Sequence, residues 1–182
     1  MREQIDQQAS KLDDIENRLR RNNIRMVGLP KQCEGANPIR FLEEWLRETF
    51  GESAFSPLFG IERAHRVPFR ALKDGHPRPL LMKLLNYNNK VTLLQKAREK
   101  GEFFYKGSRI SLYPDFSPEL SKRRAEFTPI KRNLLKSNIT YALLYPARLW
   151  IMTPNGPQLF DSPRKVAQWL EEYKLHTEHK DG

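Results

Sequence analysis

The sequence contains few residues of the kinds that cross-link a chain or hold it in a membrane. Its 182 residues include one cysteine, Cys33, which excludes an intrachain disulfide framework and any metal site made of several thiolates. No apolar run approaches the roughly 18 to 20 residues of a membrane span, and no signal peptide opens the chain. We therefore expect a protein of a reducing compartment, the cytosol or nucleus, that does not span a membrane.

Motifs of common catalytic sites are missing as well. The four histidines form no HExxH pair, and neither a GxSxG elbow nor a GxxxxGK[ST] phosphate loop is present. Carboxylates are numerous, but none lies in a recognisable metal-binding pattern. We expect a protein that is not an enzyme and that needs no cofactor or metal. A nuclease or strand-transfer enzyme is the alternative that the residues leave open.

Positive charge is abundant and unevenly distributed. Lys and Arg number 32 against 22 Asp and Glu, which gives a net charge of +10 and a pI near 9.8. Residues 62–83 carry six basic side chains against two acidic ones, and residues 115–148 carry seven against three. Such a balance suggests a polyanionic partner, either nucleic acid or an anionic membrane surface. The clustering favours a binding surface over a solubilising coat.

Residues 1–22 have the pattern of the end of a coiled coil. Ile5, Leu12 and Leu19 are seven apart, and Ile15 occupies the alternate core position. Leucine at the first core position with isoleucine at the second favours three or four strands over two. The alternative is an amphipathic helical extension that remains in solvent.

Residues 23–114 mix strand and helix patterns. The apolar periodicity predicts four strands and two helices, with strands at 23–29, 60–67, 80–86 and 103–113, a helix opening at Asn37-Pro38, and a helix over 88–100 whose apolar stripe is Val91, Leu94 and Ala97. The last strand is interrupted by a turn at Lys106-Gly107. This βαββαβ order is the split βαβ arrangement of ferredoxin-like and RRM-type domains.

Residues 115–175 predict a second, smaller α+β domain. A helix begins at Ser117-Pro118 and is divided near Pro129, because proline lacks the N–H that a helix interior requires. Strands at about 140–145 and 148–153 lead to a hairpin turn at Asn155-Gly156, a short strand at 158–160 and a last helix that starts at Ser162-Pro163. Residues 176–182 are expected to form a frayed tail.

Two groups of side chains could bind nucleic acid. Strand alternation places Arg25 on the opposite face from Ile24 and Met26, so Arg25 and Lys83 offer cations where an RRM usually has stacking rings. This favours phosphate contact with little base readout, whereas ordinary solvated strand positions are the alternative. Tyr145 and Arg148 form a plausible stacking and phosphate pair, although a core tyrosine would fit the pattern nearly as well.

Five motifs occur in order along the chain: RRNNIRMVGLP, IERAHRVP, KAREKGEFFYKG, RRAEF and LLYPARL. Over roughly residues 17–173, this series resembles the protein encoded by the first open reading frame of L1-type LINE retrotransposons. The resemblance implies a homotrimer held by a coiled coil (1–22), an atypical RRM (23–114) and a C-terminal RNA-binding domain (115–175). It also implies a coat protein and nucleic-acid chaperone that is needed for retrotransposition.

The resemblance further implies partners and a binding set. The partners are single-stranded RNA, single-stranded DNA and the element's reverse transcriptase protein, with no membrane partner. The expected location is cytoplasmic ribonucleoprotein particles, with the nucleus as a second location. The end of the coiled coil adds Arg20 and Arg21, which could also serve only as cations at a helix C-terminus. With these, the two strand cations and the turn lysine added, the expected RNA-binding residues are Arg20, Arg21, Asn23, Arg25, Lys83, Arg98, Lys106, Arg123, Arg124, Tyr145 and Arg148. A coiled-coil scaffold, or a host-domesticated RNA-binding derivative without chaperone activity, is the alternative.

Overall fold

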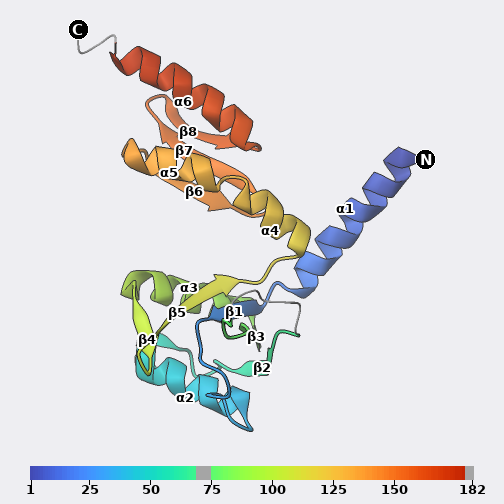
Figure 1. Cartoon of the computed structure of the whole chain (residues 1–182), viewed down its shortest axis with the longest axis vertical. Helices are drawn as coiled ribbons and strands as arrows, with labels where there is room; N and C mark the ends of the chain where they lie inside the picture. Colours follow the sequence, from blue (N-terminus) through green and yellow to red (C-terminus); the bar gives the residue numbers. More distant parts are fainter. Residues whose placement is uncertain (69–74, 179–182) are drawn as a thin grey trace. The chain divides into compact units, whose positions relative to one another are not determined.

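The protein is an α+β structure with antiparallel sheets, as its computed structural model shows (Figure 1). The structure describes residues 1–68 and 75–178, with the backbone alone described for 176–178. The chain divides into two compact units, Met1–Phe116 and Ser117–Gly182. Each unit has its own antiparallel sheet and its own set of buried apolar side chains.

The first unit begins with helix α1 (Arg2–Leu19). Its apolar side chains are left uncovered by the described residues of the first unit, since Ile5, Leu12, Ile15 and Leu19 are between 53% and 74% exposed. An exposed salt bridge joins Arg18 to Asp14. The helix ends at Leu19, and the chain turns through Arg20, whose backbone N–H donates to the carbonyl of Glu16.

A five-stranded antiparallel sheet follows. Its strands are β1 (Asn23–Val27), β2 (Ile61–Arg66), β3 (Leu80–Leu84), β4 (Phe103–Tyr105) and β5 (Ser108–Pro114), in the spatial order β2-β3-β1-β5-β4. The predicted fourth strand is in fact a hairpin, because Lys106 and Gly107 adopt φ angles of 45° and 81° and reverse the chain between β4 and β5. Counting that hairpin as one strand, the predicted βαββαβ order of elements is confirmed.

Two helices cover one face of this sheet: α2 (Pro38–Phe50) and α3 (Tyr87–Lys100). The start of α2 is confirmed, since the Asn37 side chain accepts a hydrogen bond from the Arg40 N–H and Pro38 occupies the first turn. A 3₁₀ turn, η1 (Glu52–Ala54), follows α2. The core between helices and sheet contains Ile24, Met26, Leu42, Leu46, Leu80, Met82 and Leu93.

The predicted apolar stripe of the second helix is wrong in part. Val91 is 45% exposed, whereas Leu93 and Ala97 are buried together with Lys90. The spacing of the buried residues, three and then four, is still that of one helix face. On this face the Lys90 amine is buried against the backbone that follows α1, where it donates to the Arg21 carbonyl at 2.8 Å. This contact, which joins residues 69 positions apart, is not visible in the apolar pattern.

The second unit combines three helices with a three-stranded sheet of order β6-β7-β8. Its elements are α4 (Pro118–Ala125), α5 (Thr128–Lys136), β6 (Tyr141–Leu144), β7 (Arg148–Thr153), β8 (Gly156–Phe160) and α6 (Pro163–Glu178). The Ser117 hydroxyl accepts from the Leu120 N–H and caps α4, as predicted. The predicted division at Pro129 is confirmed, since α5 begins one residue earlier.

Two details of the second unit differ from expectation. The β7–β8 register pairs Thr153 with Gly156, so the central turn residues are Pro154 and Asn155 rather than Asn155 and Gly156. The fixed φ of Pro154 suits the first central position of a type I turn, and Gly156 follows with a φ of 104°. Helix α6 runs to Glu178, three residues into the predicted tail.

No helix in the part of the chain that the structure describes is long and apolar enough to cross a membrane.

Candidate nucleic-acid interface

The end of α1 and the start of β1 are joined by one buried carboxylate. Asp115, at 1% exposure, follows β5 and lies beside the first residue of β1. Its Oδ2 accepts from Arg20 Nη1 at 2.9 Å and from Asn23 Nδ2 at 3.1 Å, and its Oδ1 accepts from Arg25 Nη2 at 2.9 Å. The structure therefore brings together three of the predicted RNA-binding residues around an acid that the sequence did not single out.

The charges of this cluster are partly balanced. Burial alone would raise the pKa of Asp115, but the hydrogen bonds from Arg25, Asn23 and Arg20 outweigh it, so the pKa lies below its ordinary value. Arg20 also donates two hydrogen bonds to Glu16 Oε1, from Nε at 3.0 Å and from Nη2 at 2.7 Å. The Arg20 and Arg25 side chains remain 29% and 34% exposed. Both guanidiniums are thus oriented by Asp115 while part of each faces solvent.

Arg21 and Lys90 complete the junction. The Arg21 guanidinium lies 4.3 Å from the centre of the Tyr87 ring, a cation–π contact at the N-terminus of α3. Burial lowers the pKa of Lys90 to about 8, against a smaller opposing effect of the nearby Asp115 charge. With Arg20, Arg25 and Lys90 charged, the junction retains excess positive charge over its two carboxylates, Glu16 and Asp115.

Among the described residues of the first unit, no helix covers the face of the sheet opposite α2 and α3. The predicted alternation in β1 is confirmed: Ile24 and Met26 are fully buried, whereas Arg25 is partly exposed. Because paired residues of antiparallel strands share a face, the register adds Lys83, which lies opposite Asn23, and Tyr113, which lies opposite Arg25. We call this surface the open face.

Lys83 is part of the open face but is paired there. Its Nζ lies 3.0 Å from Glu62 Oε1, and both side chains are partly exposed, so the pair is weak and screened by salt. Arg63 is the cross-strand neighbour of Lys83 on β2 and is exposed.

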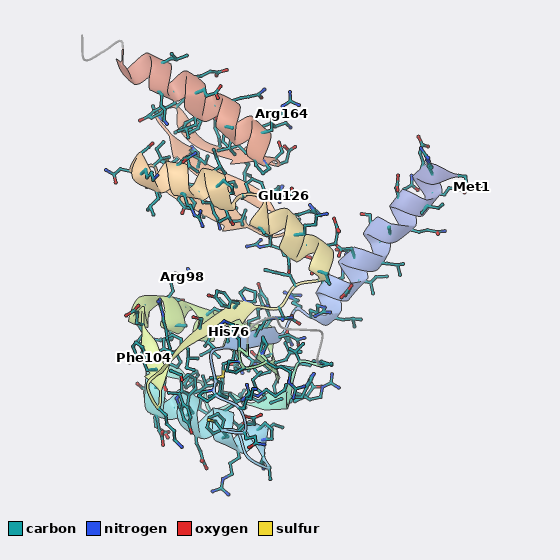
Figure 2. All side chains as sticks on the ribbon, in the orientation of Figure 1. Met1, His76, Arg98, Phe104, Glu126 and Arg164 are labelled. Atoms are coloured by element: carbon teal, nitrogen blue, oxygen red, sulfur yellow. The ribbon has the colours of Figure 1, made fainter. Side chains whose placement is uncertain are left out.

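Two aromatic residues of the open face were missed at the sequence level: Tyr113 and Phe104. Tyr113 is 52% exposed and Phe104 is 55% exposed. Figure 2 shows Phe104 on the β4–β5 hairpin. Their positions could have been found from alternation along 103–113, where Ile110 is buried and Arg109 and Tyr113 are exposed.

Arg66 illustrates a basic residue of the 62–83 cluster that is structural. Its guanidinium binds Glu34 through Nε at 2.7 Å and Nη2 at 2.6 Å, and it donates to the carbonyls of Leu29, Pro30 and Arg78. Two other members of the cluster, Arg70 and Lys73, lie outside the described residues.

The remaining predicted residues of the first unit are at its periphery. Arg98 is exposed in the last turn of α3 (Figure 2). Lys106 is exposed at the hairpin turn, with Nζ 5.5 Å from the centre of the Tyr105 ring. Neither residue joins the Asp115 cluster.

In the second unit, Arg124 is half-buried beneath the β6–β7 turn. Its Nη1 donates to the carbonyls of Pro146 at 2.6 Å and Leu144 at 3.2 Å, and its Nη2 donates to that of Leu143 at 3.2 Å. Burial lowers its pKa. Arg124 therefore shapes the turn that presents Tyr145. Arg123, Tyr145 and Arg148 are exposed on the same unit.

The chemistry of these surfaces is that of cations and rings. Across the described ranges, no group of three or more His, Cys, Asp and Glu side chains is placed to hold a metal ion. Guanidiniums with free edges beside exposed rings can bind phosphates and stack on bases.

Comparisons with known proteins agree with the resemblance. No protein-family model matches the sequence. The chain is 32% identical to the mouse LINE-1 retrotransposable element ORF1 protein over 161 residues, 86% of this chain and 44% of that protein. It is 34% identical to the mouse LINE-1 type transposase domain-containing protein 1 over 81% of this chain and 19% of that protein, and 32% identical to the human protein of that name over 86% and 18%. The chain thus spans less than half the length of these curated relatives, and it belongs to the LINE-1 ORF1-like proteins.

Proposed function

We propose that the protein coats single-stranded RNA as a nucleic-acid chaperone in a LINE retrotransposon ribonucleoprotein, and that it supports retrotransposition without enzyme activity of its own. The observation that carries the proposal is the Asp115 cluster, which holds the guanidiniums of Arg20 and Arg25 in fixed positions with part of each exposed. Fixed guanidiniums are suited to phosphate, and they bind without reading base sequence. The relationship to the mouse ORF1 protein supports the LINE context.

The proposed domain division follows the predicted one. Residues 23–114 act as an atypical RRM, which is supported by the sheet order β2-β3-β1-β5 with two helices on one face. Residues 115–175 act as the C-terminal RNA-binding domain, with Arg123, Tyr145 and Arg148 as contacts. We place the protein in cytoplasmic ribonucleoprotein particles and the nucleus, together with the element's reverse transcriptase protein.

Helix α1 is proposed to assemble three copies. Its exposed seam of Ile5, Leu12, Ile15 and Leu19 supports this, because an exposed apolar stripe at heptad spacing is buried when helices associate. Three copies on one strand would combine weak phosphate contacts through high effective concentration. Replacing Leu12→Asp should reduce the mass measured by sedimentation equilibrium, whereas Gln7→Asp, away from the seam, should not. Equal masses for both variants would contradict the seam.

The test of RNA binding is fluorescence anisotropy of a labelled ~25-nucleotide RNA, single-stranded and duplex, at several salt concentrations. We expect tighter binding of the single strand, with log K falling linearly with log salt. No single-strand binding at low salt by a protein of trimer mass would refute the proposal. A scaffold, or a host-domesticated derivative without chaperone activity, is the alternative, and it would fail to accelerate annealing of complementary strands.

A further inference from the structure

Exposed rings and cations occur together on the open face of the first unit. Reading across the sheet, the register places His65, Leu81, Arg25 and Tyr113 in one row, on β2, β3, β1 and β5. Arg63, Lys83 and Asn23 form the next row. Tyr113 therefore lies beside a guanidinium that Asp115 holds in place.

The Tyr113 ring is not used to build the core. It is 52% exposed, and among the described residues it makes no ring–ring or cation–ring contact. By contrast, Tyr105 of the same hairpin packs edge-on against Phe41, with centroids 5.4 Å apart. Phe104 points to the open face, since it pairs with the exposed Arg109. Arg109 and Tyr113 are four positions apart on β5, a distance of about 13 Å along the strand.

The charge of the face identifies its ligand. The face carries four cations: Arg25, Arg63, Lys83 and Arg109. Lys83 pairs with Glu62 at 3.0 Å, and Arg109 pairs with Glu102 at 3.2 Å. Because both pairs are at least partly exposed, a phosphate can displace the carboxylates. A protein partner with an apolar surface would remove water from these cations without pairing their charge, which is costly. A single-stranded nucleic acid satisfies both features, because its phosphates pair with the cations while its unpaired bases stack on rings.

We infer that Tyr113 is a base-stacking residue, with Phe104 as a second platform, and that single strands are bound across the open face by stacking as well as by phosphate contact. This rests on the proposed function and deepens it. It departs from the sequence-level expectation of phosphate contact with little use of bases, which followed from the lack of rings on β1 and β3. Because every base has a π face, the stacking adds affinity without sequence specificity.

The experiment compares two labelled single strands of equal length, an oligothymidylate and an abasic sugar-phosphate oligomer, by anisotropy with the full chain. The wild type should bind the oligothymidylate more tightly. Tyr113→Leu should weaken that binding by about 5- to 150-fold, the range for loss of one base–ring stack, and leave abasic binding and the salt slope unchanged. Tyr113→Phe keeps the ring and should bind like the wild type. Leu58→Ala, at an exposed apolar residue in the loop before β2, is the matched control.

The outcomes separate the two proposals. Equal wild-type affinity for both strands, or unchanged oligothymidylate binding by Tyr113→Leu, would overturn the stacking inference and leave the coat function standing. Absence of wild-type binding to either strand would instead refute the proposed function. If Tyr113→Leu lost the same affinity for both strands, the variant would be disturbing the Arg25 cluster. That result would also overturn the assignment of a stacking role.

Discussion

Replacing Asp115→Asn tests whether the buried carboxylate holds the junction of α1 and β1 together. The change keeps the shape of the side chain but removes the charge and places an amide N–H₂ toward a guanidinium. Breaking a fully buried ion pair costs about 3–5 kcal/mol. Because Arg20 and Arg25 are about one-third exposed and can regain water, we expect a smaller loss of about 2–3 kcal/mol in the free energy of unfolding. For a unit of this size, that is a fall in Tm of about 10 °C.

The assay is thermal unfolding followed by circular dichroism near neutral pH, with Asp14→Asn as the control. Asp14 pairs with Arg18 on the exposed surface of α1, where removal of a charge should cost at most about 1 kcal/mol. If Asp115→Asn melted within about 2 °C of the wild type, the carboxylate would not stabilise the junction and the reasoning would fail.

At acid pH, Asp115→Asn and the wild type should have the same free energy of unfolding. The pKa of Asp115 is lowered by folding from its ordinary value of 3.8, so its contribution is complete above that pH. As the pH falls below 3.8 towards the lower pKa of the folded state, the wild type binds the proton and loses this stabilisation. The two stability curves should therefore converge in that window. Parallel curves down to about pH 2 would contradict the assignment.

Three further predictions concern other residues. The pKa of Lys90 is about 8 in the folded protein, against 10.5 in the unfolded chain, so the unfolded chain holds the proton more tightly. The free energy of unfolding should therefore rise with pH between these two values. Measured by urea unfolding relative to Lys90→Met, the wild type should gain about 2 kcal/mol from about pH 7 to pH 10. Arg98→Ala should lower the salt slope of RNA binding by about one per protomer at unchanged Tm. Arg124→Ala should instead lower Tm, because three carbonyls of the β6–β7 region each lose a hydrogen bond. The opposite pattern would refute both assignments. Gly28→Ala should lower the free energy of unfolding by about 3 kcal/mol or more, because the Gly28 φ is 95° and a Cβ would lie 2.1 Å from a β5 carbonyl oxygen. Its control is Gly35→Ala, at φ 61° in open space, which should lower it by only about 1 kcal/mol.

Local signals in the sequence predicted most of the elements. Asn37 and Ser117 cap helices through hydrogen bonds to nearby N–H groups, and Pro129 divides a helix through its own ring. The alternation along β1 predicted that Arg25 lies on the opposite face from Ile24 and Met26, because strand geometry alone decides which face each residue occupies. Each of these interactions is completed within a few residues.

The parts of the site that were missed depend on residues far apart in the chain. Asp115 meets Arg25 across 90 residues and Arg20 across 95, and no periodicity indicates such a pairing. The burial of Lys90 depends on where α3 packs relative to the end of α1, 69 residues earlier. Tyr113 was not predicted for a different reason, since ordinary RRMs carry their stacking rings on the first and third strands, whereas Tyr113 lies on β5.

The junction also determines the rotational phase between the seam of α1 and the sheet. Each residue of a helix turns by 100° and advances by 1.5 Å. Because Arg20 is bound to Asp115 and the Arg21 carbonyl to Lys90, the helix cannot turn independently of the sheet without breaking those contacts. Insertion of one residue between Leu12 and Leu19 would rotate the earlier part of the seam by 100° around its axis. The number of residues in this segment therefore determines the direction in which the open face points in the proposed three-copy assembly.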